Sequence, residues 1–232
     1  MGQIKVVSID IFGTLVDPDG KKPPFWLLIL GDTYTNELAN KYRADFLNSL
    51  YQYLKNAAAL EKQFLSLKAL FEICFSKLFG QIGLDYNVKE ATQLLVYYHL
   101  HSPLYNDSML FLNSVGKKYP ICLASDMDDD MIGTLKQMYT FDHIFTSEQL
   151  RLYKATADGR FFSAISSYYG VRPEEVMHIG DGILEIVGAS KAGIITCWLN
   201  RTGTKWSHAV KPNYEVSSLV EVAAILGVRI NS

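Results

Sequence analysis

Residues 4–17 have the sequence IKVVSIDIFGTLVD, in which a short run of mostly β-branched residues ends at an aspartate. The run over 4–9 predicts a buried strand, because branched apolar side chains pack well inside a sheet. Gly13 and Thr14 then predict a turn. Asp10 therefore stands at the carboxyl end of a strand, which is where open parallel sheets bind their ligands.

Four later segments have the same apolar character and are separated mostly by stretches of helical length. The predicted strands are 119–124, 143–145, 176–179 and 194–198, and the predicted helices are 131–139, 159–169, 183–192 and 216–226. Alternating strands and helices predict a parallel sheet with its covering helices. The expected fold is therefore α/β, a Rossmann-like parallel sheet core with helices on both faces.

The roughly one hundred residues between the first two strands have helical spacing and almost no strand signal. Apolar side chains recur every three or four residues over 38–54 and 60–78, and 88–100 has the character of a further helix. Prolines and glycines at 18–24, and Pro103, mark both connections. The sequence predicts an all-helical inserted cap domain at 18–104, with a core made of 1–17 and 105–232.

The composition excludes several classes of function. The 232 residues are 49% hydrophobic, and 22 basic against 24 acidic side chains leave no basic field for a nucleic acid. Apolar runs fall far short of the roughly 20 residues of a membrane span, and the first residues have no secretory signal pattern, so we expect a cytoplasmic protein. The three cysteines lie far apart among apolar neighbours and predict core thiols.

Polar residues at other strand ends complete a possible site with Asp10. Ser125 ends the second strand, Lys154 precedes a helix, and Asp181 and Glu185 follow the fourth strand. These residues offer a carboxylate that could attack, a hydroxyl and an amine that could hold an anion, and an acidic pair that could hold a metal. Phosphoryl transfer through an aspartyl intermediate needs this set, because cations must neutralise charge before two anions can approach.

These four motifs, in this order, resemble those of the haloacid dehalogenase superfamily. The resemblance extends from residue 4 to about 203 and begins with Asp10, whose motif continues two residues later with Gly-Thr. It implies that Asp10 is the nucleophile, that Ser125 and Lys154 are catalytic, and that both bind the transferred group together with Thr14. It also implies that the inserted helices are a cap that closes over the site.

The resemblance implies a magnesium site as well. Its ligands would be Asp10, the backbone carbonyl of Phe12, Asp181 and Glu185, the last directly or through water. Oxygen donors suit Mg²⁺, which keeps several of its waters. We therefore expect Mg²⁺ as the cofactor.

Phe12 departs from the phosphatase pattern of that superfamily. Phosphatases carry there a second aspartate that protonates the leaving oxygen, a contribution typically worth about 10²- to 10⁴-fold. Dehalogenases carry an aromatic residue there, since halide leaves without a proton, but they use no metal and replace the acidic residue at the position of Asp181 by a neutral one. The leading hypothesis is Mg²⁺-dependent phosphoryl transfer from a small phosphorylated metabolite, slowed by Phe12. The alternatives are a metal-independent 2-haloacid dehalogenase and a non-catalytic binding scaffold.

The remaining polar residues are predicted to serve the structure. Asp126 and the acidic run 128–130 would cap the following helix, and His178 would be a hydrogen-bonded core residue. Arg43, His99 and Tyr51 are assigned to surface or packing roles. The expected partner is a small-molecule substrate, with no nucleic acid or membrane, and the chain is expected to be a monomer or homodimer.

Overall fold

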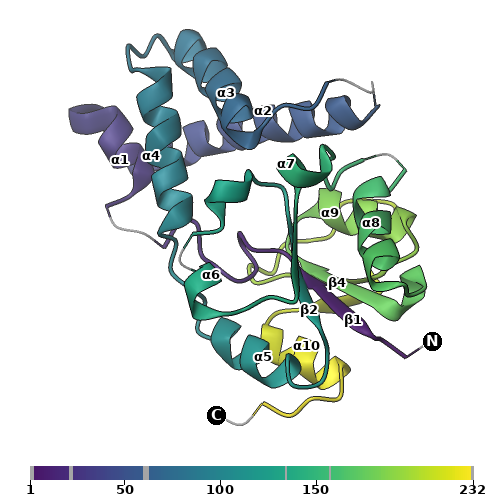
Figure 1. The fold of residues 1–232 in the computed structure, drawn as a ribbon. Helices are drawn as coiled ribbons and strands as arrows, with labels where there is room; N and C mark the ends of the chain where they lie inside the picture. The colour runs from purple at the N-terminus through teal and green to yellow at the C-terminus, as the bar shows by residue number, and fades with distance from the viewer. Residues whose placement is uncertain (1–2, 21–22, 60–62, 134, 157, 231–232) are drawn as a thin grey trace.

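The computed structural model describes residues 3–20, 23–59, 63–133, 135–156 and 158–230, and within them a parallel sheet lies at the centre of the molecule (Figure 1). Its strands are β1 (Val6–Ile9), β2 (Ile121–Ser125), β3 (His143–Thr146), β4 (Val176–Gly180), β5 (Ile195–Leu199) and β6 (Tyr214–Val216). Their order is β3-β2-β1-β4-β5-β6, and all neighbouring pairs are parallel. The expected α/β fold is confirmed.

Helices cover both faces of the sheet, as the apolar strands require. On one face Val7 and Ile9 share a buried cluster with residues of α5 (Ser108–Val115) and α10 (Leu219–Ile225). On the other face Val6 lies in a cluster with residues of α8 (Arg160–Tyr169) and α9 (Ile183–Lys191). Each fully buried side chain of this kind contributes about 1.5–3 kcal/mol. The two layers fix β1 in the middle of the sheet.

Four helices lie together beyond one end of the sheet, at the top of Figure 1, and we call them the cap helices. They are α1 (Phe25–Leu30), α2 (Asn36–Ala59), α3 (Leu67–Ile82) and α4 (Val88–Leu100). Aromatic rings pack them together, with the ring centroid of Phe46 4.5 Å from that of Phe75 and 5.8 Å from that of Phe71. The division into a core and a cap domain at residues 18 and 104 stays a prediction.

Some predicted helices differ from the structure at identifiable breaks. The predicted helix 216–226 is β6 followed by α10, because Ser218 caps α10 by accepting a hydrogen bond from the Glu221 amide. Gly133, with a φ of 68°, interrupts the predicted helix 131–139. A 3₁₀ turn, Asp129–Met131, ends where that helix was predicted to begin, and the short α6 (Leu135–Met138) follows. The predicted helix 60–78 begins as α3 only after Ser66, and residues 60–62 of that prediction lie outside the described residues. Helices α1, α5 and α7 (Ser147–Leu150) had not been predicted.

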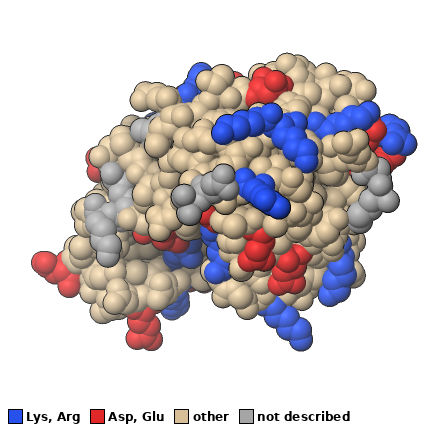
Figure 2. Space-filling model, turned by 90° about the horizontal axis from the view of Figure 1, so that it is seen from below, with Lys and Arg blue, Asp and Glu red and all other residues tan. Residues whose placement is uncertain are grey.

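On the face drawn in Figure 2, lysines and arginines lie side by side across the upper right, and acidic side chains lie at the edge of this band and below it. Over the whole chain the formal net charge is −2. Among the described helices, none has the length and apolar content needed to cross a membrane. Cys74, Cys122 and Cys197 are buried free thiols, as predicted.

Candidate active site

The carboxyl ends of β1 and β2 and the loop that follows α7 bring three of the predicted site residues together. The Ser125 hydroxyl donates a hydrogen bond to Asp10 Oδ1 at 2.9 Å, and Lys154 Nζ lies 2.5 Å from the same oxygen. All three side chains are buried. β1 pairs with β2 on one side and β4 on the other, so Asp10 lies where the strand order reverses, the usual ligand site of such sheets.

A second carboxylate, Glu185, also binds Lys154. Glu185 Oε2 forms an ion pair with Lys154 Nζ and lies 3.1 Å from His178 Nε2, and Oε1 accepts a hydrogen bond from the Gly182 amide at 2.7 Å. Because an ionised carboxylate only accepts hydrogen bonds, His178 carries a proton on Nε2, and its Nδ1 pairs with the Ser8 hydroxyl at 3.0 Å. His178 is the hydrogen-bonded core residue that was predicted, and it also holds Glu185 against Lys154.

Burial and charge act against each other on these groups. Burial raises the pKa of Asp10, and the nearby Lys154 offsets this only in part. Burial disfavours the Lys154 ammonium, yet the carboxylates of Asp10, Glu185 and Asp126 outweigh it and raise its pKa. Burial also disfavours the charge on Glu185, but Lys154 and His178 lower the pKa of that carboxyl to about 2. The site therefore holds a charged lysine against the ionised carboxylate of Glu185.

Asp181 completes the acidic cluster, with one carboxylate oxygen each of Asp10, Asp181 and Glu185 lying within 4.8 Å of one another. Its backbone carbonyl accepts a hydrogen bond from the Trp198 indole at 2.8 Å. A Cβ on Gly13, whose φ is 79°, would lie 2.3 Å from Asp181 Oδ2, so the turn after β1 approaches Asp181 as only glycine can. The pKa of Asp181 is raised, first because the surrounding protein displaces water from the carboxylate and then because the charges of Glu185 and Asp10 repel it.

The carboxylate oxygens of the site are of the kind that Mg²⁺ binds, but several of them already have hydrogen-bond partners. Carboxylate oxygens are the ligands this ion prefers. Both oxygens of Glu185 already have partners in Gly182, Lys154 and His178, however, and Oδ1 of Asp10 has two. Asp181 and the second oxygen of Asp10 remain as the available carboxylate donors, the Phe12 carbonyl stays a predicted ligand, and Lys154 already supplies a counter-charge.

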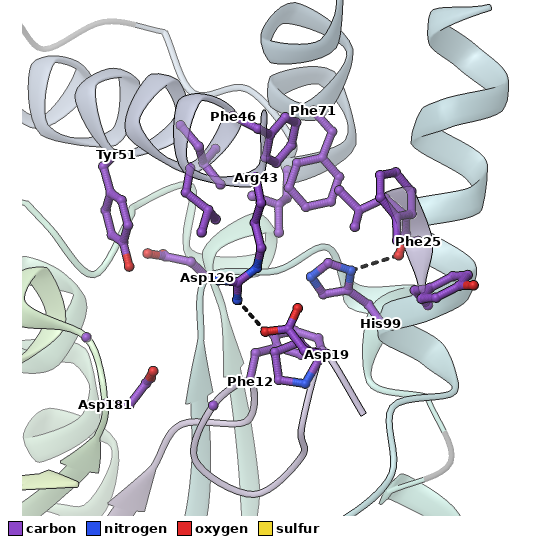
Figure 3. A pocket seen from close by; sticks show the side chains of 18 of the residues that line it. Phe12, Asp19, Phe25, Arg43, Phe46, Tyr51, Phe71, His99, Asp126 and Asp181 are labelled. Carbon is purple, nitrogen blue, oxygen red and sulfur yellow. Dashed lines mark hydrogen bonds and ion pairs between the residues drawn. The ribbon is translucent and has the colours of Figure 1, made fainter. Parts of the chain in front are cut away.

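A cavity of about 570 Å³ lies between these residues and the cap helices. Figure 3 shows Tyr51 descending from α2 with its hydroxyl directed toward the side of the cavity where Asp126 and Asp181 lie. Arg43, also from α2, crosses the cavity to an ion pair with Asp19. Burial, followed by repulsion from Asp181 and Glu185, raises the pKa of Tyr51 to about 12.

Phe12 stands in the cavity wall beside the nucleophile. Its ring meets that of His99 edge to face, with centroids 4.5 Å apart. His99 Nδ1 pairs with the Leu95 carbonyl at 2.8 Å, and burial lowers the pKa of this histidine. A neutral imidazole and a phenyl ring thus occupy the place where a phosphatase would have its proton donor.

The structure brings together Asp10, Phe12, Ser125, Lys154, Asp181 and Glu185, all of which line the cavity. Thr14 is buried beside them but does not line it, and its hydroxyl has no partner among the described residues. Arg43, His99 and Tyr51 do line it, although packing or surface roles were predicted for them. Asp126 does not cap a helix: it lines the cavity and accepts a hydrogen bond from the Lys154 amide at 2.9 Å.

Comparison with known proteins places this site in a family. Residues 4–193 match the model of the haloacid dehalogenase-like hydrolases. The chain belongs to that family. Among its relatives is the (S)-2-haloacid dehalogenase of Pseudomonas sp. (strain YL), which is 23% identical over 230 residues, covering 97% of this chain and 95% of the relative.

Solved structures of haloacid dehalogenase-like hydrolases have the same fold. L-2-haloacid dehalogenase RSc1362 aligns with a TM-score of 0.82 at 15% identity, covering 97% of this chain and 100% of that one. The putative HAD-hydrolase YfnB from Bacillus subtilis, solved bound to magnesium, aligns with a TM-score of 0.79 at 19% identity, covering 97% and 99%. At such identities the likeness concerns the fold.

Proposed function

We propose that this hydrolase displaces halide from carbon-2 of a 2-halocarboxylic acid, with Asp10 as the nucleophile. The observation that carries the proposal is Phe12, since a halide leaves without the proton that this side chain cannot give. The relative whose alignment covers 97% of this chain is a 2-haloacid dehalogenase. It supports dehalogenation over the phosphoryl transfer that the sequence motifs alone favoured.

The first step is a direct substitution. An Asp10 carboxylate oxygen attacks carbon-2, the carbon–halogen bond breaks, and halide leaves with the bonding electron pair, so that an ester joins Asp10 to the substrate. Ser125 and Lys154 hold Asp10 Oδ1 and thereby orient the attacking group. Arg43, which reaches across the cavity from α2, is the cation for the substrate carboxylate. Attack opposite the halogen inverts the configuration at carbon-2.

The second step hydrolyses the ester. Water gives a proton to a base as it attacks the carboxyl carbon of Asp10, and the bond between that carbon and the ester oxygen breaks. The ester oxygen takes the proton back from the base and leaves as the hydroxyl of the 2-hydroxy acid. Asp181 is the base in this proposal, because its carboxylate lies beside Asp10 and its raised pKa favours taking a proton. The net reaction consumes one water and yields the 2-hydroxy acid, one halide ion and one proton.

The test is halide release from 2-chloropropanoate and 2-bromopropanoate in excess chelator. We expect release from one enantiomer, loss of at least about 10³-fold in Asp10→Asn, and unchanged release in Asp85→Asn, an exposed aspartate far from β1. Absence of halide release from these acids and from their longer 2-bromo homologues, with or without chelator, would contradict the proposal.

Magnesium-dependent phosphoryl transfer remains the second candidate, favoured by the cluster of Asp10, Asp181 and Glu185. Asp10 and Asp181 would hold the ion, which when bound would neutralise charge on a phosphoryl group. The same chain would then release phosphate from an acyl or aryl phosphate, only with magnesium and only with Asp10 intact. Asp181→Asn would abolish that activity, whereas in a dehalogenase it would spare the first halide release and slow the second step.

A further inference from the structure

We propose that the cavity selects 2-halo acids with a bulky apolar substituent on carbon-2, such as a benzyl group or an alkyl chain of about four or more carbons. The proposal rests on the proposed function and names its substrate class.

The walls away from Asp10 are apolar and incompletely buried. Phe25 from α1, Leu47 and Leu50 from α2, and Leu95 from α4 line the cavity there, and each keeps part of its surface exposed. Removing apolar surface from water is favourable and roughly proportional to its area. A ligand with a large apolar substituent would cover these side chains, whereas a ligand with a single methyl group would leave most of their surface exposed to water.

The cavity is also too large for a small haloacid. A three-carbon 2-halo acid has about six heavy atoms and, at the water-like share of about 30 Å³ for each, fills about 180 Å³. The cavity measures about 570 Å³. About two thirds of the space is therefore available to a substituent.

The charged side chains that line the cavity lie around the reacting end. Lys154, Asp10 and Asp181 form that end, and Arg43 reaches across the cavity to Asp19. Away from these groups the wall is hydrocarbon and aromatic, and Figure 3 shows Phe46, Phe71 and Phe25 gathered on the side of His99. His99 adds no charge there, because its Nδ1 pairs with a backbone carbonyl and burial lowers its pKa. Such a division suits an acid with an apolar tail.

The test is kcat/KM for halide release from a series of 2-bromo acids, from propanoate to hexanoate and 3-phenylpropanoate. We expect a rise of about fourfold for each added methylene, which corresponds to about 0.8 kcal/mol, and a higher value for the phenyl compound than for 2-bromopropanoate. A series that is flat, or highest at 2-bromopropanoate, overturns the substrate class while leaving dehalogenation intact.

A binding measurement keeps the two proposals separate. If no member of the series releases halide, the proposed function fails, and calorimetry with unreactive 3-phenylpropanoate and propanoate still tests the cavity. We expect the phenyl acid to bind at least tenfold more tightly, and equal affinities would overturn the inference.

A pair of variants on α4 locates the effect. Leu95→Trp fills the cavity and should lower the ratio of kcat/KM for the phenyl acid over 2-bromopropanoate at least tenfold, whereas Gln93→Trp, on the exposed side of α4, should leave the ratio unchanged. An unchanged ratio in a folded Leu95→Trp protein would contradict the proposal, and if that variant does not fold, the wild-type series decides.

Discussion

Lys154 lies between two buried carboxylates, Asp10 and Glu185, and is their nearest counter-charge. Removing one partner of a buried pair strands the other charge and typically costs about 3–5 kcal/mol. We therefore expect Lys154→Met to lower the free energy of unfolding by about that amount and to abolish halide release. Urea unfolding at pH 7 measures the first effect.

The matched control is the double variant Lys154→Met/Glu185→Gln, which removes the charge on both partners. It should recover much of the lost stability and none of the activity. If it stays as unstable as Lys154→Met, the Lys154–Glu185 pair is not the origin of the loss.

At the residue scale, the sequence predicts the site residues that lie at strand ends and misses the site residues that the cap helices contribute. Asp10, Ser125 and Asp181 were found because parallel strands end at one edge of a sheet. Arg43 and Tyr51 share a helix face with apolar residues at spacings of three and four, so periodicity assigns them to a face and cannot say what that face covers. Their place over Asp10 depends on how α2 packs on the core, which local spacing does not encode.

At the scale of elements, the loop after β2 holds the first turn of α3. Asp128, buried and 61 residues away in sequence, accepts hydrogen bonds from the amides of Leu67 at 2.6 Å and Lys68 at 3.1 Å. Nearby, the Tyr153 hydroxyl donates to the Leu65 carbonyl at 2.7 Å and accepts from its amide at 3.1 Å. Tyr153 precedes Lys154, so the same loops that build the site also hold a cap helix.

Asp128→Ala should therefore destabilise α3. Loss of such an N-terminal acceptor costs about 0.5–2 kcal/mol. We expect faster hydrogen exchange at the Leu67 and Lys68 amides and a lower free energy of unfolding. Asp130→Ala, which removes only an exposed ion pair with Lys68, should cost less than about 1 kcal/mol. Equal exchange rates in the two variants would contradict the role given to Asp128.

Some of the helix boundaries have a local signal in the sequence, and others do not. Ser218 and Glu221 have the spacing of a capping box, so the start of α10 could have been found in the sequence. Gly133 could likewise have divided the predicted helix 131–139. The acidic run at 128–130 was interpreted as a cap for its own helix, and no local signal says that Asp128 caps α3, because that contact joins distant parts of the chain.

At the scale of the whole molecule, stability depends on pH through the buried acidic groups. Burial raises the pKa of Asp126 from 3.8 to about 6. The folded protein then binds more protons than the unfolded chain between these values, so this residue makes the protein less stable as pH rises through that window. Above it, an ionised Asp126 costs the folded state about 1–3 kcal/mol.

Asp126→Asn should therefore stabilise the protein at pH 7 by about 1–3 kcal/mol, with a smaller gain at pH 4. Asparagine keeps the acceptor oxygen for the Lys154 amide. Urea unfolding at the two pH values checks this, with the exposed Asp85→Asn expected to change stability by less than about 0.5 kcal/mol. A loss of stability at pH 7 would contradict the assignment.

The fold class followed from alternating strands and helices, whereas the strand order did not, because neither periodicity nor spacing states which strands become neighbours. That order puts β1 between β2 and β4 and so joins Asp10 to Ser125 on one side and Asp181 on the other. The meeting of residues 10, 154 and 181 in one cavity, on which the sequence argument depended, is observed.

Covalent attachment of the substrate to Asp10 is the central claim, and mass spectrometry of a rapidly quenched single turnover tests it most directly. With a 2-bromo acid and excess chelator, we predict a mass increase equal to the acid minus hydrogen bromide, located on the peptide that contains Asp10 and absent from Asp10→Asn. An unmodified peptide during halide release, or an adduct that forms only from a phosphate ester with magnesium, would contradict the account.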